Sequence, residues 1–185
     1  MSKGTLVQSA EEAARTLMAD YAETWRLLLQ YDEDWLEVPT EAAQSKSSLE
    51  HEVVVASIAR FRRFLAARGQ SSSLFGNRRG EALEGILGSI EQTMFGQPLY
   101  RSREEKAAHL LYFLIKDHPF VDGNKRIGSL LFLLYMQQEE MTHRLNAQAL
   151  TTLTLLIAES APARKNQMIR LVANMLLEPD RRKTG

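Results

Sequence analysis

Apolar residues recur at helical spacing along most of the chain, and this pattern predicts a protein built almost wholly from helices. We expect helices over residues 10–30, 48–67, 81–94, 103–117, 127–138, 147–159 and 164–177. Two of these segments, 103–117 and 127–138, are apolar on nearly every side, which is typical of helices at the centre of a fold. The predicted fold class is therefore all-α, a helical bundle with very little strand.

Capping residues indicate where three of these helices begin. Ser9 with Glu12, and Ser102 with Glu105, have the spacing of a capping box, in which the hydroxyl accepts a hydrogen bond from the amide three residues later. Asn146 is suited to cap the helix predicted over residues 147–159 in the same way. We expect a helix to follow each of these residues.

The first two predicted helices carry their apolar residues on one side. We expect both apolar faces to pack against other parts of the protein, although Tyr21 and Trp25 are also candidates for contact with a ligand or a partner. The apolar positions are Leu17, Met18, Tyr21, Trp25, Leu28 and Leu29 in the first helix and Leu49, Val53, Ile58, Phe61 and Leu65 in the second. The second helix also carries a basic cluster, either a solvated face or a docking patch, which consists of Arg60, Arg62, Arg63 and Arg68.

Two connections are rich in residues that interrupt regular structure. Residues 69–80 combine serine, glycine and arginine, and we expect them to form a loop. Gly96 and Pro98 follow the helix predicted over 81–94, so the chain cannot continue there as a regular helix. On residue types alone, this second connection is a turn.

Composition narrows the classes of function. A chain of 185 residues has the length of one domain, and 44% apolar with 25% charged residues is ordinary for a soluble globular protein. The 23 basic and 23 acidic residues give no net charge, which argues against nucleic acid as a partner. The absence of cysteine excludes disulfides and thiolate metal sites. No apolar run approaches the length of a membrane span and no secretory segment is recognisable, so we expect a cytoplasmic protein without a membrane partner.

One stretch between the two most apolar segments concentrates residues that carry chemistry. Pro119 disfavours helical backbone at the residue before it, so we expect the preceding helix to stop near Asp117 and His118 to be extended. The amides of residues 123–126 would then project from the N-terminus of the following helix, where phosphate binds favourably. The full stretch reads His118-Pro119-Phe120-Val121-Asp122-Gly123-Asn124-Lys125-Arg126.

The first half of this stretch supplies a base and a metal ligand. His118 can take a proton from an attacking hydroxyl near neutral pH. Asp122 offers a hard oxygen ligand, which suits Mg²⁺ that carries phosphates. Gly123 lets a phosphate approach the backbone closely, because it has no side chain.

The second half supplies groups that stabilise negative charge. Asn124 can donate a hydrogen bond to a developing negative oxygen. Lys125 and Arg126 offer a point charge and a planar fork to the same phosphates. The alternative interpretation is a polar loop between two helices, with both cations solvated.

These nine residues resemble the signature of the Fic/Doc (Fido) family, which reads roughly His-Pro-Phe-x-Asp/Glu-Gly-Asn-Gly/Lys-Arg, and every specified position is matched. The resemblance covers about residues 81–136 and implies a Fido-type helical bundle with a short flap hairpin before the motif helix. It implies an enzyme that uses Mg²⁺ and ATP, or another nucleoside triphosphate, to modify a hydroxyl of a target protein. By this resemblance His118 is the catalytic base, Asp122 holds the metal, and the phosphates are bound by Gly123, Asn124, Lys125 and Arg126.

Two positions depart from the commonest Fic pattern. Lys125 stands where that pattern has a second glycine, and Ser129 stands where it often has a second arginine. Both departures resemble the Doc branch, the toxins of death-on-curing type, which transfer phosphate, whereas Fic enzymes transfer AMP. We therefore favour phosphoryl transfer. The alternatives are a protein adenylyltransferase and a non-catalytic adaptor on the same fold.

The resemblance also implies how the target is held. In the family, a flap beside the active site keeps the target segment extended. The corresponding residues here would pair with the target backbone by strand addition; they are Gly96, Gln97, Pro98, Leu99 and Tyr100.

Regulation is expected to come from outside the catalytic core. Many family members carry an inhibitory helix of Ser/Thr-x-x-x-Glu-Gly/Asn, which Ser48 to Glu52 begin to match before Val53 breaks the pattern. With Ser129 in place of the second arginine, such a glutamate would have no partner. We therefore expect a separate antitoxin, or a homodimer, to contact an N-terminal helical extension over residues 1–75, with the catalytic core over 76–180.

Overall fold

The computed structural model describes residues 3–39 and 43–177, and these residues form eight α-helices, two short 3₁₀ helices and one small hairpin. With 64% of residues in helices, the predicted all-α class is confirmed. The chain divides into two compact units, Met1–Glu37 and Val38–Gly185. The boundary predicted between an N-terminal extension, residues 1–75, and a catalytic core, residues 76–180, stays a prediction. The last residues of that predicted core, 178–180, lie outside the described ranges.

The smaller unit holds two consecutive helices, α1 (Lys3–Asp20) and α2 (Ala22–Asp32). The predicted start at residue 10 is wrong, because α1 runs through Ser9 instead of beginning after it. The predicted single helix is also interrupted at Tyr21, whose φ of −106° and ψ of 18° are not helical. Apolar side chains expected to pack are exposed, since α2 has no buried residue. The exposed positions are Leu17, Met18, Tyr21, Trp25, Leu28 and Leu29.

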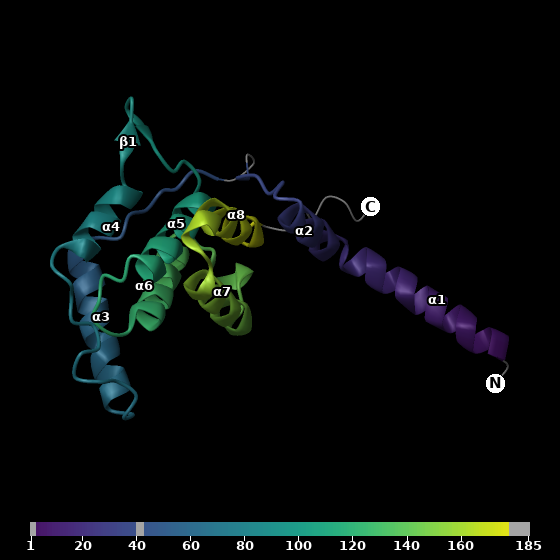
Figure 1. Ribbon diagram of the computed structural model, residues 1–185, viewed down its shortest axis with the longest axis horizontal. Coiled ribbons are helices and arrows are strands. Elements are labelled where there is room, and N and C mark those ends of the chain that lie inside the picture. Colours follow the sequence, from purple (N-terminus) through teal and green to yellow (C-terminus); the bar gives the residue numbers. More distant parts are fainter. Residues whose placement is uncertain (1–2, 40–42, 178–185) are drawn as a thin grey trace. The chain divides into compact units, whose positions relative to one another are not determined.

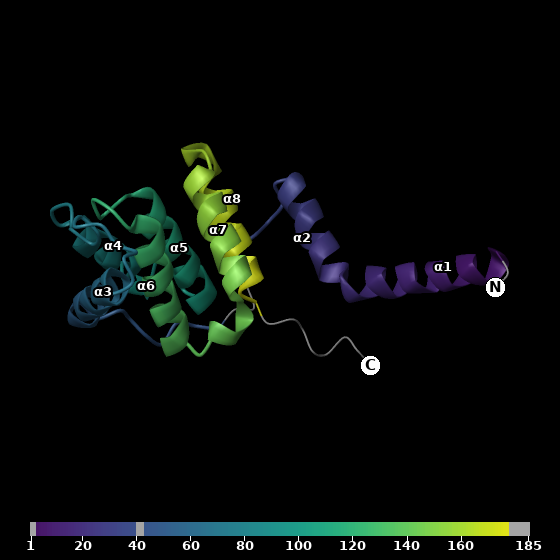
Figure 2. The same cartoon turned by 90° about the horizontal axis from the view of Figure 1, so that it is seen from below.

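The larger unit is organised around two adjacent helices, α5 (Arg103–Lys116) and α6 (Asn124–Gln138). Within this unit α3 and α4 lie on one side of the pair, and α7 and α8 lie on the other (Figures 1 and 2). Gly128 permits the close approach of the pair, because a Cβ there would lie 3.3 Å from the Cβ of Leu114. The pair is therefore the rigid support for the loop that joins it, residues 117–123.

Two helices precede the pair, α3 (His51–Ala66) and α4 (Ala82–Ile90). The residues of α3 that are buried are Val54, Ile58 and Leu65, whereas the predicted Val53 is 45% exposed. Each residue turns a helix by about 100°, so an error of one position moves a side chain off the buried face. The prediction for α4 was too long at its end, because the chain leaves the helix at Ile90.

A two-stranded antiparallel hairpin follows α4, with β1 (Thr93–Met94) paired to β2 (Gln97–Pro98). Phe95 and Gly96 at its tip both have positive φ, 51° and 77°. Such a pair favours a tight two-residue hairpin turn. The short hairpin implied by the family resemblance is therefore present, and its strands are exposed on both faces.

The C-terminal part of the chain packs beside α5 as α7 (Ala147–Glu159) and α8 (Lys165–Met175). Short 3₁₀ turns precede them, η1 (Thr142–Arg144) and η2 (Pro162–Arg164). Two predicted caps are confirmed. The hydroxyl of Ser102 accepts from the Glu105 amide at 3.0 Å, and Oδ1 of Asn146 accepts from the Ala149 amide at 2.8 Å.

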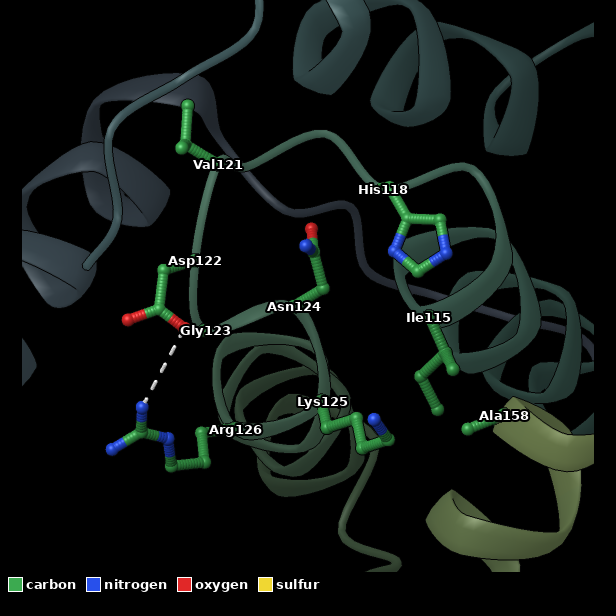
Figure 3. Close-up of a pocket in the computed structure, with 9 residues that line it drawn as sticks. All are labelled: Ile115, His118, Val121, Asp122, Gly123, Asn124, Lys125, Arg126 and Ala158. Carbon is green, nitrogen blue, oxygen red and sulfur yellow. Dashed lines mark ion pairs between the residues drawn. The ribbon is translucent and has the colours of Figure 1, made fainter. Parts of the chain in front are cut away.

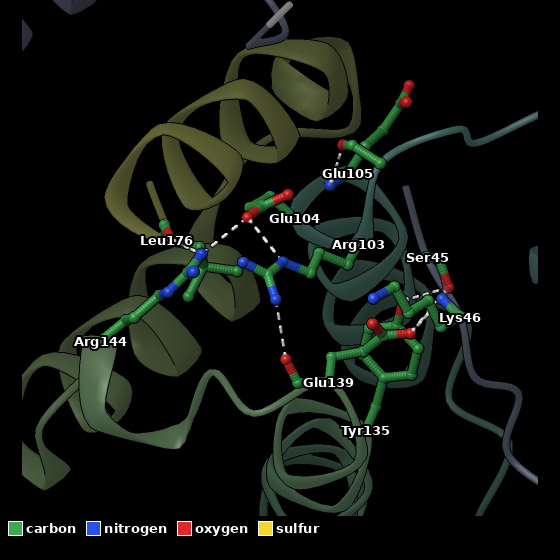
Figure 4. Close-up of polar contacts among 10 residues, drawn as sticks. Ser45, Lys46, Arg103, Glu104, Glu105, Tyr135, Glu139, Arg144 and Leu176 are labelled. Carbon is green, nitrogen blue, oxygen red and sulfur yellow. Dashed lines mark hydrogen bonds and ion pairs between the residues drawn. The ribbon is translucent and has the colours of Figure 1, made fainter. Parts of the chain in front are cut away.

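Buried polar contacts fasten the end of the bundle away from the loop 117–123 (Figure 4). Glu104, which is 1% exposed, accepts from Arg144 Nη1 at 2.7 Å and from Arg103 Nε at 3.2 Å. Oε1 of Glu139 accepts from the Ser45 hydroxyl and from the amides of residues 46 and 47, at 2.8 to 2.9 Å. Two carboxylates therefore anchor the starts and ends of several segments in one place.

Candidate functional site

A pocket of about 320 Å³ opens where α5 ends and α6 begins (Figure 3). Its size is in the range of small-molecule sites. Seven of its nine lining residues belong to the stretch singled out in the sequence, and the remaining two are apolar. The lining consists of Ile115, His118, Val121, Asp122, Gly123, Asn124, Lys125, Arg126 and Ala158.

The end of α5 places the His118 imidazole at the pocket wall. Asp117 forms the C-cap of the helix, as predicted, and His118 follows it with a φ of 48°. The predicted extended conformation of His118 is therefore wrong. A residue with positive φ commonly follows the last turn of a helix, histidine tolerates it better than most side chains, and Pro119 then prevents the helix from continuing. This turn aims the ring toward the start of α6 (Figure 3).

The start of α6 presents backbone amides to the pocket. Gly123 is its N-cap with a φ of 92°, and the first intrahelical bond runs from the Ile127 amide to the Gly123 carbonyl at 2.8 Å. The helix begins at Asn124, three residues before the predicted start. A Cβ at Gly123 would collide with the Phe75 ring, so this position excludes every other residue on space as well as on φ.

Asn124 fixes the loop with its own side chain. Its Oδ1 accepts from the Phe120 amide at 2.9 Å, and its Nδ2 donates to the Phe120 carbonyl at 2.8 Å. One side-chain N–H of the two is used in this way, which leaves a second for an anion. Phe120 itself is fully buried, as expected for the residue that anchors the loop.

The charged side chains of the motif lie on different sides of the helix start. Asp122 and Arg126 face each other, with 3.9 Å between Oδ1 and Nη2 (Figure 3). The Lys125 side chain lies on the other side of the helix start, toward Ala158 of α7 (Figure 3). The pocket therefore has a carboxylate and a guanidinium, Asp122 and Arg126, on one side of the helix start, and the ammonium group of Lys125 on the other.

Asp122 is the pocket's candidate metal ligand. The described residues contain no group of three or more histidine, cysteine, aspartate or glutamate side chains that could hold a metal by themselves. A single carboxylate beside an anion site nevertheless fits Mg²⁺, which typically takes one or two carboxylates and completes its shell with phosphate oxygens and water. The donor chemistry is thus compatible with a metal that arrives with a nucleotide.

Ser129, one turn further along α6, faces α7 by its hydrogen bonds. Its hydroxyl donates to the Lys125 carbonyl at 2.9 Å and lies 3.0 Å from Oγ1 of Thr154. A side chain engaged in this way joins two helices, and it is too short to reach phosphates as an arginine would.

Sequence reasoning missed the contribution of residues 70–79. Ser72 bonds to Asp122, and Phe75, which is fully buried, packs against Gly123. The one available signal was Phe75 itself, a large aromatic residue within a stretch otherwise typical of a solvated loop. The predicted flap residues 96–100 do not line the pocket; the hairpin lies beyond the end of α4 (Figure 1).

Within the described residues, no helix is both long and apolar enough to cross a membrane. The chain matches no curated protein and no solved structure. Residues 51–136, which run from α3 through the hairpin and the pocket motif to α6, match the model of the Fic/DOC family, and this segment is what the chain shares with that family.

Proposed function

We propose that the protein is a nucleotide-dependent transferase of the Fic/Doc type, which modifies a hydroxyl of a target protein. The observation that carries this proposal is the pocket, in which a histidine, a carboxylate and two cations surround the amides at the start of α6. These are the groups that phosphoryl and nucleotidyl transfer need: a base, a metal ligand and an anion cradle. The match of residues 51–136 to the Fic/DOC family supports the same conclusion.

In this reaction His118 accepts the proton of the attacking hydroxyl. The hydroxyl oxygen forms a new bond to phosphorus, and the bond from that phosphorus to the leaving oxygen breaks. The residues bind and orient the triphosphate through the amides of Gly123 to Arg126 and through the side chains of Lys125 and Arg126. Mg²⁺, held by Asp122, would neutralise charge that builds up on the phosphates.

The leaving group of this reaction is either ADP or pyrophosphate, and we favour ADP. Attack on the γ-phosphorus leaves phosphate on the target and releases ADP, whereas attack on the α-phosphorus leaves AMP and releases pyrophosphate. Lys125 lines the pocket with a long, charged side chain where a glycine would have none. Ser129, bonded to Thr154, cannot clamp distal phosphates. Both features weaken the orientation that presents the α-phosphorus to His118, so Doc-like phosphorylation is favoured over AMP transfer.

Changing His118 to alanine is the main test of the enzymatic assignment. General-base catalysis typically contributes about 10²–10⁴-fold, so His118→Ala should lose most of the transfer rate. Nucleotide affinity, measured by calorimetry with ATP and Mg²⁺, should survive because the amides and cations are unchanged. His143→Ala, at an exposed histidine outside the pocket, is the matched control. Target labelling by His118→Ala at the normal rate would reject the assignment.

The transferred group is identified by mass. Protein extract is incubated with the purified chain and ATP labelled at either the α or the γ position, and the labelled protein is then isolated. Label from the γ position alone, with the added mass of one phosphate, is the expected result. Label from the α position, with the mass of an adenylate, would establish AMP transfer and leave the role of His118 intact.

A non-catalytic adaptor is the alternative from another class. An adaptor does not need a base, a metal ligand and phosphate-binding cations in one pocket. Failure of ATP with Mg²⁺ to bind in the calorimeter would favour it.

We also propose that α1 and α2 form a contact surface for a protein partner, an antitoxin or a second copy of the chain. Their apolar side chains are exposed, including Trp25 at 52% and Leu28 at 52%. Residues 1–37 hold eight acidic and three basic residues, whereas the rest of the chain has an excess of basic residues. This charge would favour a partner with a basic rim. Light scattering should show any self-association reduced in Trp25→Glu, with Glu23→Gln as control; an unchanged association state would leave the antitoxin as the occupant.

A further inference from the structure

Residues 70–79, which we call the clamp loop, run beside the pocket motif and bond to its backbone. The amide of Gly76 donates to the Asp122 carbonyl at 3.0 Å, and the amide of Val121 donates to the Asn77 carbonyl at 2.8 Å. One step further, the Arg79 amide donates to the Pro119 carbonyl at 2.8 Å. The clamp loop therefore runs beside residues 119–122, the segment that leads into α6.

The clamp loop also reaches the charged side chains of the pocket. The Ser72 hydroxyl donates to Oδ2 of Asp122 at 2.6 Å. This bond turns the carboxylate so that its other oxygen, Oδ1, faces Arg126 at 3.9 Å. A short hydrogen bond to one oxygen limits the rotation of a carboxylate, and such supporting bonds orient metal ligands in proteins.

Arg126 is held by the same loop. Its Nη1 donates to the Gln70 carbonyl at 2.6 Å, and its guanidinium carbon lies 4.5 Å from the centre of the Phe75 ring. The Phe75 ring is fully buried and meets Phe61 of α3 edge-on, with 5.8 Å between the ring centres. The aromatic platform under Arg126 is thus fixed by the core rather than by solvent-exposed chain.

A second arginine anchors the clamp loop to α3. Nη2 of Arg62 donates to the Ser73 carbonyl at 2.7 Å, and its Nη1 donates to Oδ1 of Asn77 at 3.3 Å. Arg62 was predicted as part of a basic cluster that is either solvated or a docking patch. For Arg62 itself, the contacts assign a role inside the chain, since they connect the helix to both arms of the loop.

We propose that Ser72 is a positioning residue, which orients the Asp122 carboxylate for a divalent cation bound with a nucleotide. The proposal rests on the proposed function and names a residue outside the motif on which metal binding depends. A loop that merely filled surface would bond to the motif through its backbone alone. Here the Ser72 side chain contacts the carboxylate that lines the pocket, Asp122. The same loop also holds the neighbouring guanidinium of Arg126 through the Gln70 carbonyl.

Metal affinity gives the test, with Mn²⁺ as a paramagnetic probe and a non-hydrolysable ATP analogue as the nucleotide. Loss of a group that supports a metal ligand typically weakens metal affinity about 10–100-fold, so Ser72→Ala should raise the Kd for Mn²⁺ by that factor in electron paramagnetic resonance titrations. Ser72→Thr keeps the hydroxyl and should restore most of the affinity. Ser73→Ala is the matched control, because the Arg62 contact of Ser73 uses its backbone carbonyl.

The transfer rate gives a second readout. In Ser72→Ala the Mg²⁺ concentration for half-maximal rate should rise, while the rate at saturating Mg²⁺ stays close to that of the wild type. A Kd for Mn²⁺ in Ser72→Ala within twofold of the wild type, or a Ser72→Thr variant as weak as Ser72→Ala, overturns the positioning role even if transfer occurs. A wild type that binds Mn²⁺ with the expected dependence on Ser72 but transfers nothing supports the positioning role and rejects the proposed function. No binding of Mn²⁺ with the nucleotide by the wild type overturns both.

Discussion

The α5–α6 pair and the α1–α2 pair are both rich in apolar side chains, yet the structure treats them in opposite ways. In α5 ten consecutive or nearly consecutive residues are buried, whereas α2 has none. The difference lies in what surrounds each pair: α5 contacts α4, α6, α7 and α8, while α1 and α2 contact each other in a unit of their own. An apolar face predicts that something should cover it, and only the fold says whether the same chain does so.

The largest difference in stability between the two helix pairs should come from removing a buried aromatic ring. Phe132 of α6 is fully buried, and a Phe→Ala change at such a site typically lowers the free energy of unfolding by about 3–5 kcal/mol. Leu28→Ala in α2, where the side chain is 52% exposed, should change it by about 0.5 kcal/mol or less. Urea unfolding followed by circular dichroism measures both. Equal losses would mean that α2 is covered in solution.

Ion pairs should divide in the same way. The Arg144–Glu104 pair has side chains only 5% and 2% exposed, so Arg144→Met leaves a buried carboxylate short of a partner and should lower the free energy of unfolding by about 3–5 kcal/mol. In α2 the pair of Arg26 with Glu23 has side chains 43% and 61% exposed. Arg26→Met should therefore lose about 0–1 kcal/mol. The same urea titrations apply, and a large loss in the α2 variant would contradict the comparison.

The pH dependence of stability should also belong to the larger unit. Desolvation by burial lowers the pKa of His109 in α5 from an ordinary 6.5 to about 4. A hydrogen bond to the Glu105 carbonyl opposes this shift, and the Lys165 charge adds to it. The ring is stacked on Tyr100, with 3.8 Å between centres. Between pH 6.5 and 4 the unfolded chain takes up a proton that the folded chain does not, so the free energy of unfolding falls as pH is lowered.

This fall amounts to about 3 kcal/mol once the pH is below both values. His109→Phe should keep the stacking and remove this part of the pH dependence. Thermal unfolding across this pH range compares the variant with the wild type. A His109→Phe profile parallel to that of the wild type would show that the ring does not stay neutral in the fold.

The sequence alone predicted the parts of this protein that depend on local chemistry. The caps at Ser102 and Asn146 formed as expected, because a capping side chain needs only the amide three residues later. The all-α class followed from helical periodicity. Most of the pocket lining comes from nine contiguous residues, which span the loop 117–123 and the first turn of α6. The apolar character of α5 on all sides was also enough to predict that it is buried.

Other features depended on contacts between distant segments, which only the tertiary structure decided. His118 adopts a positive φ because the end of α5 and the start of α6 are both fixed by packing, which overrides the local preference before proline. Ser72 meets Asp122 across 50 positions of sequence, and no local rule pairs them. Likewise, α1 and α2 have the pattern of packed helices but are exposed, since periodicity fixes which side chains share a face and not what lies opposite that face.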